Sequence, residues 1–263
     1  MKIDRLKEQD INDIIEKESV DLSSFKVRDN LNPKIFDREQ QMHQEVRTRL
    51  LMIADDFFET LNIGWVEIND IVLTGSLANY NWSKFSDVDI HILLDYSEVD
   101  DNVELVKEYF MSKKNLWNEK HNITIKGYDV ELYVQHTEES HVSTGVYSVM
   151  WNEWLIKPKK DNYEIDTKKV EQKANTIIDT INHLVNLYKG GDYDKVIRSI
   201  QTLKEKIKKM RQSGLDREGE YSFENIAFKV LRRTEFLDKL SALETKAYDK
   251  SLTLVESIKY LKN

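Results

Sequence analysis

Two acidic residues at alternate positions, Asp87 and Asp89, follow the pair Gly75–Ser76 after an interval of ten residues. In an extended strand, residues two apart point to the same side and lie about 7 Å apart. Carboxylates so placed can share two divalent cations, and metal ions about 4 Å apart suit in-line phosphoryl transfer. Mg²⁺ keeps several waters and takes few protein carboxylates. We therefore expect Asp87 and Asp89 to hold two Mg²⁺ ions, or Mn²⁺ in their place.

A third carboxylate is expected on a neighbouring strand. The stretch YDVELYVQ, residues 128–135, alternates apolar and polar residues, and it offers Asp129 and Glu131 on its polar face. Glu131 is flanked by Val130 and Leu132, and we prefer it to Asp129 as the third metal-binding and catalytic acid. Such a residue can act as the general base on an acceptor hydroxyl.

The residues that begin this motif suit contact with a phosphate. Gly75 lets the backbone approach a phosphate closely, because it has no side chain. Ser76 can offer its N–H and its hydroxyl to phosphate oxygens. Residues 77–81 are expected to begin a helix, whose N-terminus favours anions.

Hydrophobic periodicity predicts the elements that position these residues. Helices are expected near residues 4–17, from Asp37 to about residue 61, and over 102–118. Strands are expected over residues 71–74, 87–94, 123–126 and 128–135, with a hairpin over 145–157 that turns at Asn152–Glu153. In the strand 87–94, the apolar residues face one way, and Asp87, Asp89 and His91 face the other.

Two aromatic residues and His91 have more than one expected role, and two further tryptophans have one. Tyr80 and Trp82 could stack on a base or simply pack their loop. His91 shares the aspartate face, where a structural hydrogen bond is favoured over contact with substrate. Trp151 and Trp154 are expected to fill the core of the hairpin.

The pattern becomes helical after Pro158, which we take as the boundary between a domain at 1–158 and one at 159–263. Helices are expected over 165–189, after Asp192 with breaks at Gly214 and Gly219, after Ser222, and over 241–261. Four antiparallel helices with short loops are the economical packing.

Two lysines of this helical part could bind nucleotide. Lys204 and Lys208 recur at helical spacing one step round from an apolar seam, so they could border the cleft and contact a triphosphate or a polynucleotide. The alternative is a solvated helix face, which we favour slightly.

The stretch from Leu73 to Leu94 resembles the signature of the DNA-polymerase-beta-like nucleotidyltransferase superfamily, particularly its minimal and antibiotic-modifying branches. The matching residues are Gly75, Ser76, Ser86, Asp87 and Asp89, with Ala78 as the usual small residue. The chain has Asn79 and Tyr80 where the minimal branch commonly has arginine and glycine, which indicates a different phosphate grip or a different donor selection. The resemblance covers about residues 38–158.

The resemblance implies a mixed sheet flanked by helices, here followed by an all-α bundle, which makes an α+β protein. It implies transfer of a nucleoside monophosphate from an NTP such as ATP to an acceptor hydroxyl, with Mg²⁺ and release of pyrophosphate. It also implies that Gly75, Ser76 and Ser86 contact the nucleotide. The acceptor is an RNA or tRNA end, a protein side chain or a small molecule.

Two other functions stay open at this point. One is an inactive module that binds nucleotide or RNA, although the presence of all three acids speaks against it. The other is a toxin-like nucleotidyltransferase that acts on a protein or a tRNA.

Composition excludes several classes of protein. The chain has 263 residues and no Cys, so it has no disulfide scaffold, no Cys-based zinc site and no cysteine nucleophile. No apolar run reaches the roughly 18 residues of a membrane helix, and we expect a cytoplasmic protein without membrane contact. The net charge of −8 divides into −13 over residues 1–158 and +5 over residues 159–263, so net acidity does not exclude a nucleic-acid acceptor. The sequence indicates no oligomeric state.

Overall fold

The structure is a computed structural model that describes residues 25–140, 143–160 and 165–253. In these described residues it is a mixed α/β protein, 53% helical, with a curled mixed sheet of six strands and six α-helices. The described residues form two compact units, 25–160 and 165–253. The helix expected near 4–17 lies outside the described residues. None of the described helices is long and apolar enough to cross a membrane.

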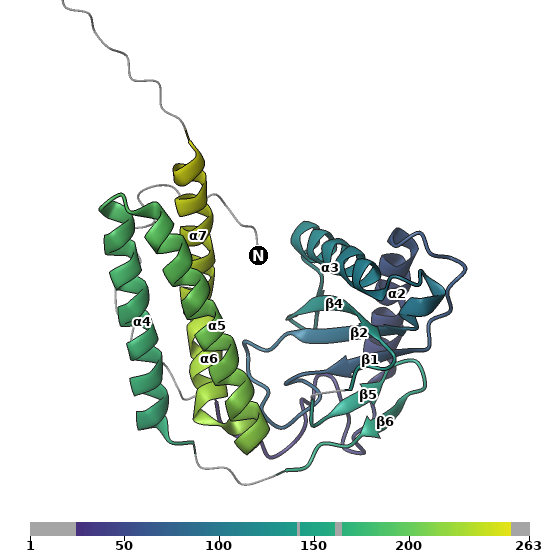
Figure 1. Ribbon diagram of the computed structural model, residues 1–263. Helices are drawn as coiled ribbons and strands as arrows, with labels where there is room; N and C mark the ends of the chain where they lie inside the picture. The colour runs from purple at the N-terminus through teal and green to yellow at the C-terminus, as the bar shows by residue number, and fades with distance from the viewer. Residues whose placement is uncertain (1–24, 141–142, 161–164, 254–263) are drawn as a thin grey trace, which may run out of the picture. The chain divides into compact units, whose positions relative to one another are not determined.

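The first unit is built on the six-stranded sheet, in the order β3-β4-β2-β1-β5-β6 (Figure 1). Its strands are β1 (Asp70–Thr74), β2 (Val88–Leu94), β3 (Thr124–Ile125), β4 (Tyr128–His136), β5 (Val146–Ser148) and β6 (Glu153–Ile156). Every neighbouring pair is antiparallel except β2 and β4, which run parallel. A parallel pair needs a crossover connection, and helix α3 (Val103–Lys120) supplies it. The predictions of β1, β2, α3 and β4 are confirmed within a few residues.

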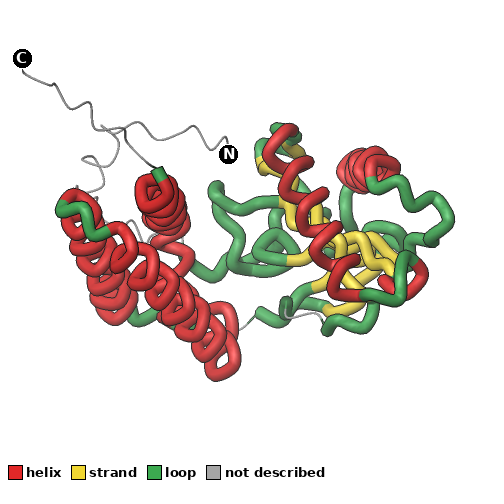
Figure 2. The backbone as a smooth tube through the Cα atoms, turned by 45° about the horizontal axis from the view of Figure 1, so that its top comes forward, coloured by secondary structure: helices red, strands yellow, loops and turns green. Residues whose placement is uncertain are grey.

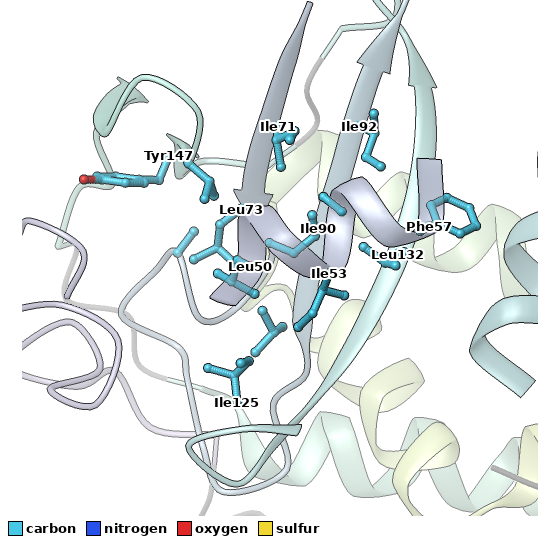
Figure 3. Close-up of a cluster of buried hydrophobic side chains, with 14 of the residues drawn as sticks. Leu50, Ile53, Phe57, Ile71, Leu73, Ile90, Ile92, Ile125, Leu132 and Tyr147 are labelled. Carbon is cyan, nitrogen blue, oxygen red and sulfur yellow. The ribbon is translucent and has the colours of Figure 1, made fainter. Parts of the chain in front are cut away.

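One face of this sheet is apolar and packs against helix α2 (Gln44–Thr60). Leu50, Ile53 and Phe57 of α2 lie against strand residues such as Ile90 and Leu132 (Figure 3), and all five are at most 5% exposed. Because strand residues alternate between faces, this packing directs the residues between them, Asp89 and Glu131 among them, to the opposite face.

Helix α2 begins at Gln44, so its predicted start at Asp37 is wrong. The Asp37 carboxylate accepts the N–H of Gln41 at 2.8 Å, Gln40 has a φ of 63°, and Phe36 pairs with Met42 in an isolated antiparallel bridge. An aspartate side chain that caps a helix can equally hold a tight turn, and here it holds the turn.

Helix α3 also covers the outer edge of β4. The Asn118 side chain accepts the backbone N–H of Leu132 at 3.2 Å and donates to its carbonyl at 3.1 Å. The amide thus takes the place that a neighbouring strand would have, since β3 pairs only with the first residues of β4. The edge next to Glu131 is therefore closed by a side chain.

The hairpin of β5 and β6 turns over residues 149–152, slightly before the predicted position. Arg47 of α2 fixes the turn by donating to the carbonyls of Val149 at 2.8 Å and Met150 at 2.7 Å. Trp154 packs against the core as expected and donates to the carbonyl of Gln40. The prediction for Trp151 is wrong, because it lies in the turn and is 65% exposed.

The second unit is built from helices in the residues that the structure describes (Figure 2). They are α4 (Thr167–Lys189), α5 (Tyr193–Glu218), α6 (Phe223–Arg233) and α7 (Phe236–Leu252), with a short 3-10 turn, η3 (Gly219–Tyr221), before α6. Asp192 caps α5 and Ser222 caps α6, as predicted. The predicted seam of α5 is buried at Val196, Ile200, Leu203 and Ile207.

Two details of this unit differ from the prediction. Helix α5 continues through Gly214, where a Cβ would lie 2.6 Å from Ser222 Oγ. Glycine is there for close packing, and the helix is not broken. Helix α7 begins at Phe236, five residues before the predicted 241.

The four helices also do not alternate in direction. Lys204 of α5 bonds to Glu244 of α7, and Arg211 of α5 bonds to Asn225 of α6. These pairs place α6 beside the later part of α5 and α7 beside its middle, and Figure 1 shows α6 and α7 following one another along α5 in the direction opposite to it. The predicted antiparallel arrangement of four helices is therefore wrong for the last pair.

Candidate functional site

The candidate site lies on the polar face of the sheet, where Asp89 is at the centre of a row across three strands. The antiparallel register pairs it with Thr74 of β1, and the parallel register pairs it with Glu131 of β4. Residues paired across strands have side chains on the same face, about 5 Å apart. Both acids are half-buried. The side chains of Asp89 and Glu131 therefore lie on the same face of the sheet.

Gly75 follows the last residue of β1 and brings the chain against Asp89. Its φ is 71°, and a Cβ at this position would lie 2.0 Å from Asp89 Oδ2. The close approach expected of Gly75 therefore involves a carboxylate of the site itself. Any side chain here would meet both a strained backbone and the Asp89 carboxylate.

The loop from Ser76 to Ser86 is closed on itself by its two end serines. The Ser76 hydroxyl donates to Ser86 Oγ at 2.7 Å, and the backbone N–H of Ser83 donates to the same oxygen at 2.9 Å. The loop brings both predicted nucleotide-binding hydroxyls to the end of β1 and the start of β2. The helix predicted over residues 77–81 is absent, because this segment forms turns, with Asn79 N–H donating to the carbonyl of Ser76.

The same loop is anchored to a segment near residue 30. The backbone N–H of Arg28 donates to the carbonyl of Tyr80 at 2.7 Å, and the Trp82 indole donates to the carbonyl of Asn30 at 2.9 Å. The Arg28 guanidinium lies 4.9 Å from the centre of the Trp82 ring. Tyr80 is buried. Both aromatic residues thus pack their loop, which was one of the two roles expected for them.

A second anchor of the loop is formed by the segment before β5. The Asn79 amide donates to Thr144 Oγ1 at 2.7 Å, and a Cβ on Gly145 would lie 2.0 Å from the carbonyl oxygen of Ala78. Asn79, where the minimal branch has a different residue, therefore has a structural role here.

Glu131 has a neighbour for which no role was predicted from the sequence. The Tyr133 hydroxyl donates to Glu131 Oε2. The Tyr133 ring stacks on His91, with ring centroids 4.9 Å apart and an angle of 25° between the planes. The ammonium of Lys114, from α3, lies 4.3 Å from the centre of the same ring. The alternation of β4 puts Tyr133 on the face of Glu131, but no local pattern indicates Lys114.

His91 makes the structural hydrogen bond that the sequence favoured. Its Nδ1 lies 2.7 Å from Oε1 of Gln135, and Gln135 Nε2 donates to the carbonyl of Glu139 at 3.1 Å. Since the amide oxygen can only accept, Nδ1 of His91 carries the proton. The hydrogen bonds fix the His91 ring beneath Tyr133.

The alternative third acid, Asp129, lies in a different setting. It is exposed and pairs with Thr124 of β3, whereas Glu131 is half-buried beside Asp89. Asp87 precedes β2 and is half-buried. Among the described residues, no group of three His, Cys, Asp or Glu side chains is arranged to hold a metal ion. The donor chemistry nevertheless suits Mg²⁺ or Mn²⁺, because Asp89 and Glu131 offer carboxylate oxygens side by side.

The two lysines predicted to bind nucleotide lie on α5 of the second unit. Lys204 Nζ is 2.6 Å from Glu244 Oε2, and Lys208 is exposed. The ion pair joins α5 to α7, which gives Lys204 a structural role within its own unit.

No protein-family model, curated protein or solved structure matches the chain. Its function is therefore argued from the site itself.

Proposed function

We propose that the chain is a metal-dependent nucleotidyltransferase, which moves a nucleoside monophosphate from an NTP to an acceptor hydroxyl and releases pyrophosphate. The observation that carries this proposal is the row formed by Asp89 and Glu131 in register on parallel strands, with Gly75 against the Asp89 carboxylate. The glycine–serine pair and the first two acids that the sequence motif requires thus meet at neighbouring ends of β1 and β2.

Each residue of the site has a part in this reaction. Asp87, Asp89 and Glu131 would hold two Mg²⁺ or Mn²⁺ ions, which when bound neutralise charge on the triphosphate and pyrophosphate. Glu131 accepts the proton of the acceptor hydroxyl. The hydroxyl oxygen bonds to the α-phosphorus, and the bond from this phosphorus to pyrophosphate breaks. Ser76 and Ser86 donate to phosphate oxygens, for which Ser76 exchanges its hydrogen bond to Ser86.

The acceptor is proposed only as a class: an RNA end, a protein side chain or a small molecule. Incubation of the protein with each α-labelled NTP and Mg²⁺ in a cell extract identifies it, because the label then appears in the RNA, protein or small-molecule fraction. The preferred base follows from the same experiment.

The proposal is tested with Asp87→Asn and Asp89→Asn, which should each abolish transfer of label while the protein stays folded. Asp56→Asn is the matched control, since Asp56 is exposed on α2, and it should transfer as well as the unaltered chain. Full transfer by either site variant would refute the proposal. Nucleotide binding without transfer by the unaltered chain would favour an inactive binding module.

A further inference from the structure

We propose that Tyr133 is a positioning residue, which holds the Glu131 carboxylate in the orientation that the reaction needs. This inference rests on the proposed nucleotidyltransferase activity and deepens it. Tyr133 is not expected to touch the substrate, and its effect passes through Glu131.

A hydrogen bond joins Tyr133 to Glu131 along one strand. Tyr133 and Glu131 are two residues apart on β4, so their side chains point to the same face about 7 Å apart. The tyrosine ring must lean along the strand for its hydroxyl to reach Glu131 Oε2, as it does. A tyrosine hydroxyl that donates to one carboxylate oxygen leaves the other oxygen to face a metal ion or an acceptor proton.

The Tyr133 ring is itself held in place by residues of two other elements. His91 of β2 stacks on it at 4.9 Å, and Lys114 of α3 places its ammonium 4.3 Å from the ring centre. His91 is fixed in turn by Gln135, which is 8% exposed. A chain of contacts from the buried Gln135 therefore ends on the carboxylate of Glu131.

Loss of the Tyr133 hydrogen bond would leave the Glu131 side chain free to rotate. A free glutamate side chain has three rotatable bonds, and fixing them costs conformational entropy. A hydrogen bond to a charged group is stronger than a neutral one, and its loss corresponds to roughly a tenfold to hundredfold change in an equilibrium or rate. Tyr133 supplies such a bond before any ligand arrives.

The test compares Tyr133→Phe with Tyr96→Phe. Tyr96 is a close match, because its hydroxyl donates to the backbone carbonyl of Val134 at 2.9 Å and its ring stacks on His136 at 4.9 Å. Tyr133→Phe keeps the ring and should lower kcat about tenfold to hundredfold, with little change in the KM for NTP. Tyr96→Phe should leave both constants unchanged.

A second measurement does not depend on activity. Mn²⁺ is titrated into the full chain with a non-hydrolysable NTP analogue and followed by electron paramagnetic resonance. Tyr133→Phe should weaken Mn²⁺ binding several-fold in a chain that has Glu131, and should have no effect in a chain that carries Glu131→Gln. Thermal unfolding of each variant checks that it is folded.

The inference is overturned if Tyr133→Phe leaves both kcat and Mn²⁺ affinity unchanged, or if its effect on Mn²⁺ affinity persists in full beside Glu131→Gln. Either result would leave the proposed function intact. Failure of the proposed function shows instead as transfer that survives Asp89→Asn, and the Mn²⁺ titration then still decides the role of Tyr133.

Discussion

The Asp89 carboxylate lies against the backbone of Gly75, so closely that a Cβ on the glycine would be 2.0 Å from Oδ2. The φ of Gly75, 71°, is also one that residues with side chains rarely adopt. The chain at the end of β1 can lie this close to Asp89 only because Gly75 has no side chain.

Gly75→Ala should therefore damage both stability and activity. The backbone conformation alone costs about 1–3 kcal/mol, and the new methyl group must also displace Asp89. Gly127→Ala is the control, because Gly127 has a φ of 88° but nothing within 4 Å of a Cβ. Urea unfolding should show the larger loss for Gly75→Ala, and NMP transfer should fall only in that variant. Equal losses in both variants would contradict the contact.

The register of β2 and β4 predicts which acid is the third. Glu131→Gln should lower kcat by about 10²–10⁴, the range for removal of a general base. Asp129→Asn should retain transfer within about threefold, because Asp129 is exposed and pairs with β3 and not with Asp89. Steady-state kinetics with an α-labelled NTP measure both, and the reverse ranking would assign the role to Asp129.

Asn118→Ala should weaken the sheet at the edge beside Glu131. The substitution removes two hydrogen bonds to the Leu132 backbone, worth together about 1–2 kcal/mol. Asn115→Ala on the same helix is the control, because Asn115 is exposed and both changes raise helix propensity alike. Chemical unfolding should separate the two variants, and identical stabilities would show that the Asn118 amide contributes nothing.

Because the Tyr96 side chain is buried, we expect the free energy of unfolding to fall at high pH. Burial, with a smaller effect of the Glu139 carboxylate, raises the pKa of Tyr96 above its ordinary value. The unfolded chain then loses this proton above about pH 10 while the folded chain keeps it, so folding becomes less favourable as the pH rises. The slope from this group is about 1.4 kcal/mol per pH unit.

Tyr96→Phe should remove that part of the slope. Urea unfolding between pH 9 and pH 11 measures it as the difference between the variant and the unaltered chain. The buried Tyr147 hydroxyl, whose pKa burial also raises, is present in both proteins and cancels in the comparison. Parallel pH profiles would show that Tyr96 ionises as readily in the folded chain as in the unfolded one.

Much of the fold could be predicted because local patterns determine it. Strict alternation in residues 87–94 predicted β2 and its two faces, and Asp192 at the right position predicted the start of α5. The pairing of Asp89 with Glu131 could not be derived from alternation, because the order and direction of strands depend on contacts between distant segments.

Two of the wrong predictions share a physical reason, which is that one residue can serve two structures. Asp37 has the side chain of a helix cap but holds a turn. Gly214 is of a residue type that often ends a helix, but it lies inside α5, where it allows close packing against Ser222 and Glu224. Only the tertiary surroundings distinguish the alternatives.

The alternation along β2 also limits how this protein can change during evolution. Ile90 and Ile92 fill the core, and Asp89 and His91 lie between them on the other face. Insertion or deletion of a single residue within β2 would exchange the two sets, so that carboxylates entered the core and isoleucines the site. A substitution in this strand changes one side chain, whereas a change in its length moves every following side chain to the other face. We therefore expect natural length variation to be confined to the connections, such as the loop from Ser76 to Ser86.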